Sequence, residues 1–434
     1  MTYRKRRSRL AEWGKNLLIA LLTLSALYLL GRTQLPNALF SGSDGFWDTA
    51  ASWFRPNERP SGRYTPDGAL AALRPARLAV CRGGQRYVVQ YDAAAVEAAF
   101  GELSTILSEA LSSAVSPEPV AERVWRQALT QDGLYFDFPA SLPLSSLSAW
   151  LGNGAANTVL PHAARRLCLT GTEDGGVSLL YHNEDDGLYY ACGTTLSQEI
   201  HLAAALAGWS PNGVYFAFEA EGMDALAPYT MLPAPGEMLD FSVSNPLSDS
   251  PERLNDLLRA LSFQPQSTLE SAGQVREGND TLRLTADGIV TFHSIGDSDF
   301  RFRLPSAGRE ETLDFVRTLA ETTAGAWCGD AQLYLDRIQE NGGTLQITFQ
   351  YSLGGAPVVL PDGRAAAHFS VRNGAVTDFI LYLRTYSAGE ETTPILPELQ
   401  ATAILEGQGA GGRELVLRYL DTGGDRARAD WTAS

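Results

Sequence analysis

The sequence predicts an α+β protein with an N-terminal transmembrane helix, followed by extracytoplasmic domains in which antiparallel sheets pack against helices. Two observations lead to this prediction. Residues 16–31 form an uncharged, leucine-rich run that directly follows a dense cluster of basic residues. Beyond residue 76, short runs with strand patterning and tight-turn dipeptides alternate with segments of helical periodicity, a pattern typical of α+β domains with antiparallel sheets.

The apolar run is predicted to be an uncleaved membrane anchor. A helix needs about 20 residues to cross the hydrocarbon core, and a segment from Trp13 to Arg32 reaches this length when Lys15 extends its ammonium group toward the headgroups. Because six basic side chains lie within residues 1–15, the positive-inside rule places the N-terminus in the cytoplasm. The alternative, a cleaved signal peptide, lacks a small-residue cleavage pattern after the run. The residues assigned to the anchor are Trp13, Lys15, Leu17, Ala20, Thr23, Ala26, Tyr28 and Arg32.

The anchor divides the chain into parts with different expected locations. The parts are a cytoplasmic basic tail (1–15), the transmembrane helix (16–31), a juxtamembrane linker (32–75), a first extracytoplasmic α+β domain (76–235) and a second extracytoplasmic α+β region with duplicated hairpin units (236–434). The protein is therefore expected in the cell membrane, as a single-pass protein with its bulk outside the cytoplasm.

The first domain combines hairpins with two amphipathic helices. The expected elements are a hairpin at 77–91 around Gly83-Gly84, a helix capped by Asp92, a helix from near Pro119 with Val120, Val124 and Ala128 inward, a strand at 133–138 and a meander over 167–192. Residues 213–218 repeat the pattern G-[LV]-Y-F-x-F of residues 133–138. This repeat predicts a related pair of strands in one sheet.

The second region contains two hairpins of similar pattern, at 282–292 and 369–377, with Asp-Gly and Asn-Gly turns. The other expected elements are a helix opening at Pro251, a helix around 313–320, a strand pair at 343–353 and 356–360, a helix at 397–405 and a strand at 414–420.

Charge and cysteine content exclude some functions. The formal net charge is −16; residues 1–15 carry six basic and one acidic side chain, or +5, which leaves −21 for the rest. Such a surface repels phosphate backbones, so nucleic-acid binding is not expected. The four cysteines form no metal-binding pattern. Cys168 and Cys192 lie in one meander and could form a disulfide outside the membrane, or could be buried thiols.

Motifs for catalysis are missing from the sequence. The five histidines have no metal-ligand spacing, and there is no nucleophile elbow or phosphate-binding loop, so no cofactor is expected. Asp421-Thr422-Gly423 matches the loop of aspartic proteases, but that chemistry needs two carboxylates. No second such loop exists and little chain follows, so a hairpin turn is the favoured interpretation. Six aromatic residues could line a ligand groove, although a core role is more usual: Tyr135, Phe136, Phe138, Tyr215, Phe216 and Phe218.

Several segments of the C-terminal half resemble one known family. They are residues 275–292, Gln350-Tyr351, Gly354-Gly355-Ala-Pro357-Val358, His368–Val371, Asn373-Gly374-Ala-Val376 and the final Tyr419 with Asp430-Trp431. In this order, and with the basic tail and single anchor, they resemble the YycH/YycI regulators. The resemblance implies a non-enzymatic membrane protein that binds a sensor histidine kinase, together with a related regulator protein, and tunes its control of cell-wall metabolism.

Two other functions stay open at this point. One is an extracytoplasmic binding module for a cell-wall polymer or peptide, using an aromatic groove. The other is a hydrolase, with a dimeric aspartic protease as the concrete case. In the regulator interpretation, the small residues Ala20, Thr23, Ser25 and Ala26 would let a partner helix approach closely; otherwise they face lipid.

Overall fold

The computed structural model describes residues 73–433, apart from residues 153, 249–250, 265–272, 296–299, 305–307 and 408–412. The predicted tail and anchor, and all but the end of the linker, lie outside the described residues. Within those residues, no helix combines the length and the apolar character that crossing a membrane requires. Residues 62–434 form one compact unit. Its packed helices and its sheets, which are antiparallel apart from one parallel strand pair, confirm the predicted α+β class.

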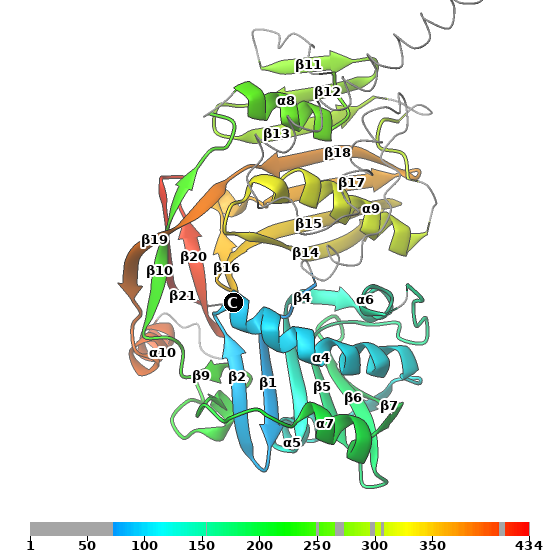
Figure 1. Ribbon diagram of the computed structural model, residues 1–434, viewed down its shortest axis with the longest axis vertical. Helices are drawn as coiled ribbons and strands as arrows, with labels where there is room; N and C mark the ends of the chain where they lie inside the picture. The colour runs from blue at the N-terminus through cyan, green and yellow to red at the C-terminus, as the bar shows by residue number, and fades with distance from the viewer. Residues whose placement is uncertain are drawn as a thin grey trace, which may run out of the picture. The chain divides into compact units, whose positions relative to one another are not determined.

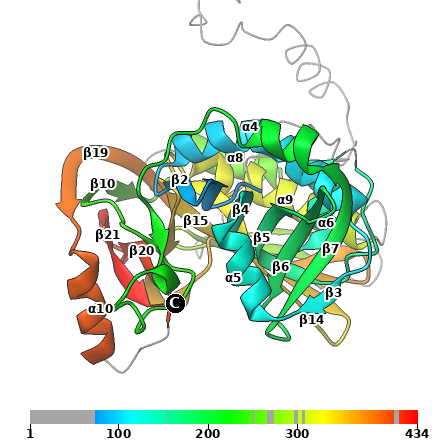
Figure 2. The ribbon, with the colours of Figure 1, turned by 90° about the horizontal axis from the view of Figure 1, so that it is seen from below.

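The first sheet has seven antiparallel strands in the order β2-β1-β4-β5-β6-β7-β3 (Figure 1). Its strands are β1 (Arg77–Arg82), β2 (Gln85–Gln90), β3 (Glu118–Val120), β4 (Gly133–Pro143), β5 (Ala163–Gly171), β6 (Gly176–Asn183) and β7 (Leu188–Ser197). Its helices are α4 (Ala93–Ser113), α5 (Glu122–Thr130), α6 (Leu144–Leu151) and α7 (Ala203–Ala205), the last preceded by a π-helical turn at Gln198–Leu202. Helices α4 and α5 lie on opposite faces of this sheet (Figure 2), and each packs on its own hydrophobic cluster.

Local sequence signals account for most of this part. The β1–β2 turn uses Gly83 and Gly84 at positive φ, and Asp92 Oδ1 accepts a hydrogen bond from Ala95 N at 3.0 Å to cap α4. The helix expected near Pro119 begins only at Glu122, because residues 118–120 pair with β7 as strand β3.

The inward face predicted for this second helix is also wrong. Val120 lies in the strand, and Val124 is 37% exposed. The buried residues of α5 are Trp125, Ala128 and Leu129, so only Ala128 was placed correctly.

The second sheet has twelve strands, ordered β11-β12-β13-β18-β17-β15-β16-β20-β21-β10-β19, with β14 paired to β15. These strands are β10 (Glu237–Ser244), β11 (Gln274–Glu277), β12 (Asp280–Leu284), β13 (Ile289–Ser294), β14 (Gln332–Asn341), β15 (Thr344–Leu353), β16 (Ala356–Val359), β17 (Ala367–Arg372), β18 (Ala375–Tyr382), β19 (Thr385–Pro394), β20 (Leu415–Asp421) and β21 (Arg426–Ala433). The helices are α8 (Pro251–Ala260), α9 (Arg309–Thr322) and α10 (Glu398–Gly407), and short 3₁₀ turns occur at Ala217–Glu219, Gly325–Trp327 and Pro361–Gly363.

The two predicted hairpins of similar pattern are confirmed, and they are neighbours in space. Hairpin β12–β13 joins hairpin β17–β18 through the antiparallel pair β13–β18. Phe292 stacks on Phe379 with ring centroids 4.9 Å apart, and Phe369 contacts Phe379 from the next strand. These rings are buried on the face that α8 and α9 cover (Figure 1).

The prediction that residues 133–138 and 213–218 share a sheet is wrong. The first segment is part of β4, but the second contains only the two-residue strand β8 (Tyr215–Phe216), which pairs with β9 (Met231–Leu232) in a separate small sheet. A similar local pattern supplies the same strand preference, whereas the pairing partner depends on the rest of the fold.

Candidate functional site

The described residues contain no group of three or more His, Cys, Asp or Glu side chains suited to holding a metal ion. The carboxylate of the protease-like motif, Asp421, has a structural role. Asp421 ends β20 at the predicted hairpin turn. Its buried carboxylate accepts bonds from Arg384 Nε and Nη2, each at 2.9 Å, and from the Tyr386 hydroxyl at 2.9 Å. A carboxylate held in this way is unsuited to activating water, which argues against the aspartic-protease alternative.

Five charged side chains meet where the first sheet contacts the approach to β20, and we call them the charge cluster. They are Arg77 on β1, Asp137 on β4, Arg165 and Arg166 on β5, and Glu414 directly before β20. Asp137 is fully buried, and the Glu414 side chain is only 5% exposed. The cluster therefore joins strands from the beginning of the described chain to one of its last strands.

The geometry of the charge cluster suits a structural role, in which its ion pairs hold the segment before β20 against the first sheet. Glu414 Oε1 accepts from Arg77 Nη2 at 2.6 Å, and Oε2 accepts from Arg166 Nη2 at 2.6 Å and from Arg165 Nη2 at 3.0 Å. Asp137 accepts from Arg77 and, at 2.8 Å, from Arg165 Nε. Because three guanidinium groups surround two carboxylates, every carboxylate in the cluster has a charged donor.

Electrostatics keep Glu414 ionised. Burial on its own would raise the pKa of Glu414, but Arg165, Arg166 and Arg77 outweigh burial and hold that pKa well below its usual range. Close by, the Tyr91 hydroxyl accepts a hydrogen bond from Leu417 N at 3.2 Å. We conclude that the cluster fixes β20 on the first sheet and does not perform acid–base chemistry.

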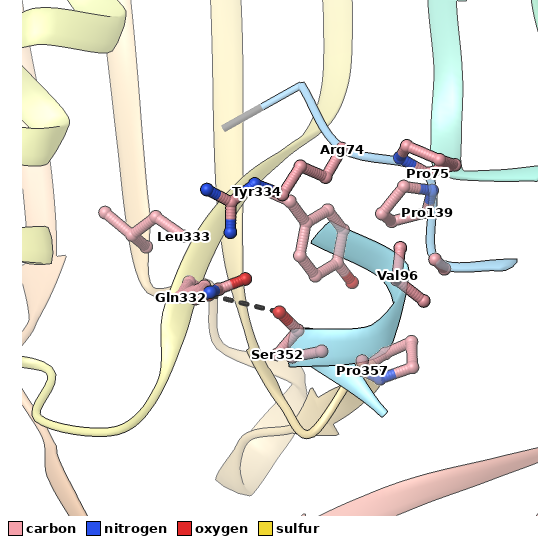
Figure 3. Close-up of a pocket in the computed structure, with 12 residues that line it drawn as sticks. Arg74, Pro75, Val96, Pro139, Gln332, Leu333, Tyr334, Ser352 and Pro357 are labelled. Carbon is pink, nitrogen blue, oxygen red and sulfur yellow. Dashed lines mark hydrogen bonds between the residues drawn. The ribbon is translucent and has the colours of Figure 1, made fainter. Parts of the chain in front are cut away.

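A small cavity lies beside this junction (Figure 3). It has a volume of about 30 Å³, and its lining includes Arg74, Val96, Pro139, Tyr334 and Pro357. A space of this size holds one or two waters rather than an organic ligand.

The aromatic residues suggested for a groove belong mostly to the core. Phe136 and Phe138 are fully buried on one face of the first sheet, while Tyr135 packs on the other face against Phe216 and Trp125. Phe218 stacks on Phe216. Tyr215 is half-buried. The core interpretation is the one that fits these positions.

The suggested disulfide between Cys168 and Cys192 is not formed; all four cysteines are free and buried. Cys168 pairs with Leu180 of β6, while Cys192 pairs with the adjacent Leu179. Adjacent strand residues point to opposite faces, so the two thiols belong to different hydrophobic clusters on either side of the sheet. The position of the two cysteines in one meander therefore does not bring their thiols into contact.

Two open surfaces remain as candidates for binding. One is a groove of about 630 Å³ next to β20 and β21, whose lining includes Leu396, Leu420, Arg426 and Arg428. Its arginines form ion pairs with Glu391 and Asp240, at 2.9 and 3.0 Å. The other is the face of the larger sheet opposite α8 and α9.

Comparison with known proteins adds the fold relationship. No family model matches the chain, and no curated protein matches it at the sequence level. Among solved structures, YycH from Bacillus subtilis is similar, with a TM-score of 0.54 and 12% sequence identity over 86% of this chain and 95% of YycH. The chain has the fold of YycH. The resemblance to the YycH/YycI regulators is thus confirmed at the level of fold.

The site residues predicted from the sequence and those found in the structure do not coincide. The anchor residues, from Trp13 to Arg32, lie outside the described residues. The charge cluster was missed by sequence reasoning altogether. One signal for it was visible: Asp137 interrupts a strand of otherwise apolar residues, and a charge at an inward strand position requires a partner. Nothing local pointed to Glu414 as part of that partnership.

Proposed function

We propose that the chain is a non-enzymatic, single-pass membrane protein that binds a sensor histidine kinase of a two-component system and tunes its control of cell-wall metabolism. The observation that supports this proposal most is the YycH-like fold over 86% of the chain, because the sequence resemblance attributes this role to the YycH/YycI family. A related regulator protein is a further partner under the same proposal.

The buried carboxylates give a second argument. Asp137, Glu414 and Asp421 each accept bonds from arginine, so none is available as a general acid or base. These groups serve to hold a scaffold together, as expected of a protein that acts by binding. The proposal also retains residues 16–31 as the anchor, a cytoplasmic N-terminus, and Ala20, Thr23 and Ala26 as the helix surface that approaches the partner.

Crosslinking in living cells tests this function. A photoreactive amino acid placed at Ala20, Thr23 or Ala26 of the full-length chain should give an adduct containing the sensor kinase. Membranes that contain the chain should show altered kinase autophosphorylation compared with membranes that lack it. No kinase adduct and unchanged autophosphorylation would contradict the proposal.

A binding module for a cell-wall polymer or peptide is the second candidate, favoured by the groove beside Leu396 and Arg428. It predicts saturable binding of cell-wall fragments to the full-length protein in detergent. Replacing Leu420, which also lines the groove, with aspartate should abolish that binding if the groove is the site.

A further inference from the structure

The larger sheet has one face covered by helices and one face open, which we call the outer face. Two rows of side chains cross seven strands on the outer face, from β11 to β14, and all of them are at least partly exposed except Gln274 at the end of the second row. The first row is Arg276, Thr281, His293, Asp378, Ser370, Gln346 and Gln339, and the second is Gln274, Arg283, Thr291, Ile380, His368, Thr348 and Arg337. Apart from Ile380, every member of both rows is polar or charged.

Alternation along the strands shows that this face is opposite the core. Phe292, Phe369 and Phe379, which alternate with these rows, are buried under α8 and α9. On the outer face, Arg283 and Arg337 are exposed, and Ile380 is 47% exposed. An antiparallel sheet with one solvated face is common, so openness alone does not identify an interface.

The charge on the outer face is the unusual feature. Arg276, Arg283 and Arg337 are exposed, and none forms an ion pair with a carboxylate of the described residues. The two rows contain one acidic residue, Asp378, and it is engaged by His293 Nδ1 at 2.5 Å. Asp336, directly before Arg337, also interacts electrostatically with it. Three arginines against two carboxylates leave a locally cationic face on a chain with a net charge of −16.

The distance between the arginines indicates how large a partner must be to contact more than one of them. Arg283 on β12 and Arg337 on β14 share one row but are separated by five strand-to-strand steps, or about 24 Å at the usual strand spacing. A small anion cannot contact both. Ile380 lies between them in the same row, so the face has an apolar centre and a charged, hydrogen-bonding periphery, as protein interfaces do.

Two occupants from the chain itself fit poorly. A second copy docked through the same face would bring arginines against arginines. The juxtamembrane linker, residues 32–75, contains five arginines and four acidic residues, so it carries no net negative charge to complement this face. We propose that the outer face docks a flat, acidic surface on the protein's membrane partner, with Ile380 as its centre and Arg283 and Arg337 at its periphery. This inference rests on the proposed function, which supplies the sensor kinase as that partner.

Affinity measurements between full-length proteins test the inference. The chain and the kinase are placed in separate nanodiscs of phosphatidylcholine, and binding is measured at low and high salt. The double variant Arg283→Glu/Arg337→Glu should bind at least about tenfold more weakly and lose much of the salt dependence; Ile380→Ser should also weaken binding. The matched control is Arg82→Glu/Arg123→Glu, which makes the same charge change at exposed arginines near the first sheet and should leave affinity within about twofold.

The outcomes separate the inference from the function it rests on. Kinase binding that is weakened equally by both double variants, or by neither, would overturn the outer face while leaving the proposed function intact. Absence of binding by the unaltered chain in separate nanodiscs would overturn the outer face, and would overturn the proposed function as well only if crosslinking from the anchor helix also gave no kinase adduct. Displacement of the kinase by phosphatidylglycerol vesicles, or self-association through the outer face, would also overturn the inference, since anionic lipid or a second copy would then be the occupant.

Discussion

Replacing Glu414 by glutamine should destabilise the protein by about 3–5 kcal/mol, the usual cost of removing one partner from a buried ion pair. Glu414 contacts the Nη2 atoms of three arginines within 3.1 Å. Glutamine keeps the shape but not the charge, and its amide nitrogen would face a guanidinium group, donor against donor. Asp137 would then be the remaining carboxylate of the cluster for three arginines, of which Arg77 and Arg166 are buried.

Urea unfolding of the full-length chain in detergent, followed by tryptophan fluorescence, measures this cost. The matched control is Glu391→Gln, which removes an ion pair between the exposed side chains of Glu391 and Arg426 and should cost below about 1 kcal/mol. If Glu414→Gln were no more destabilising than the control, the buried ion pairs of the charge cluster would not stabilise the fold more than an exposed pair does. That result would refute the prediction.

The difference in unfolding free energy between wild type and Glu414→Gln should depend on pH. The folded-state pKa of Glu414 is held below the value of about 4.3 that a glutamate has in an unfolded chain. Proton binding therefore favours the unfolded state, so the stabilisation by Glu414 is complete above about pH 4.3 and declines as the pH falls toward the folded pKa. The difference in unfolding free energy between wild type and Glu414→Gln should shrink below pH 4; a constant difference down to pH 3 would contradict this assignment.

Three further predictions follow from single contacts. Asp421→Asn should lower the unfolding free energy by about 3 kcal/mol, since the carboxylate is fully buried against an arginine. Gly329→Ala should be more costly than its backbone conformation alone explains, because a Cβ there would lie 2.1 Å from the carbonyl oxygen of Tyr386. Thiol titration should find four reactive thiols in urea and none in the folded protein, and reductant should leave the Tm unchanged, since Cys168 and Cys192 are unpaired.

The prediction for Gly329 has a matched control within the chain. Gly374 has φ +69°, almost the same as the +68° of Gly329, but no atom lies within 4 Å of its added Cβ. Gly374→Ala should therefore show only the left-handed backbone cost of about 1–2 kcal/mol, and equal losses at both sites would argue against the close approach. For Asp421, an asparagine variant as stable as wild type would contradict the prediction, because the ion pair with Arg384 would then contribute no stability.

Turns and helix starts were predictable because their causes are local. Gly83-Gly84, Asn373-Gly374 and the cap at Asp92 act through residues within a few positions, and the structure places all three as predicted. The error near Pro119 has a cause outside the local sequence: residues 118–120 pair with the distant strand β7, and this pairing displaces the helix start by three residues.

Some contacts were decided only by the tertiary structure, because they depend on which strands pair and which faces of the sheets are buried. Glu414 contacts Arg77 across 337 residues, and Cys168 and Cys192 lie on opposite faces of a sheet. Arg283 and Arg337 lie in one row of the outer face because of the register of the strand pairings between β12 and β14. The sequence by itself determined the α+β class, the hairpins and the overall acidity, because hydrophobic period, turn residues and charge are properties of neighbouring residues or of their sum. The charge cluster and the outer face required the assembled sheets, because strand order and register follow from burial over the whole chain.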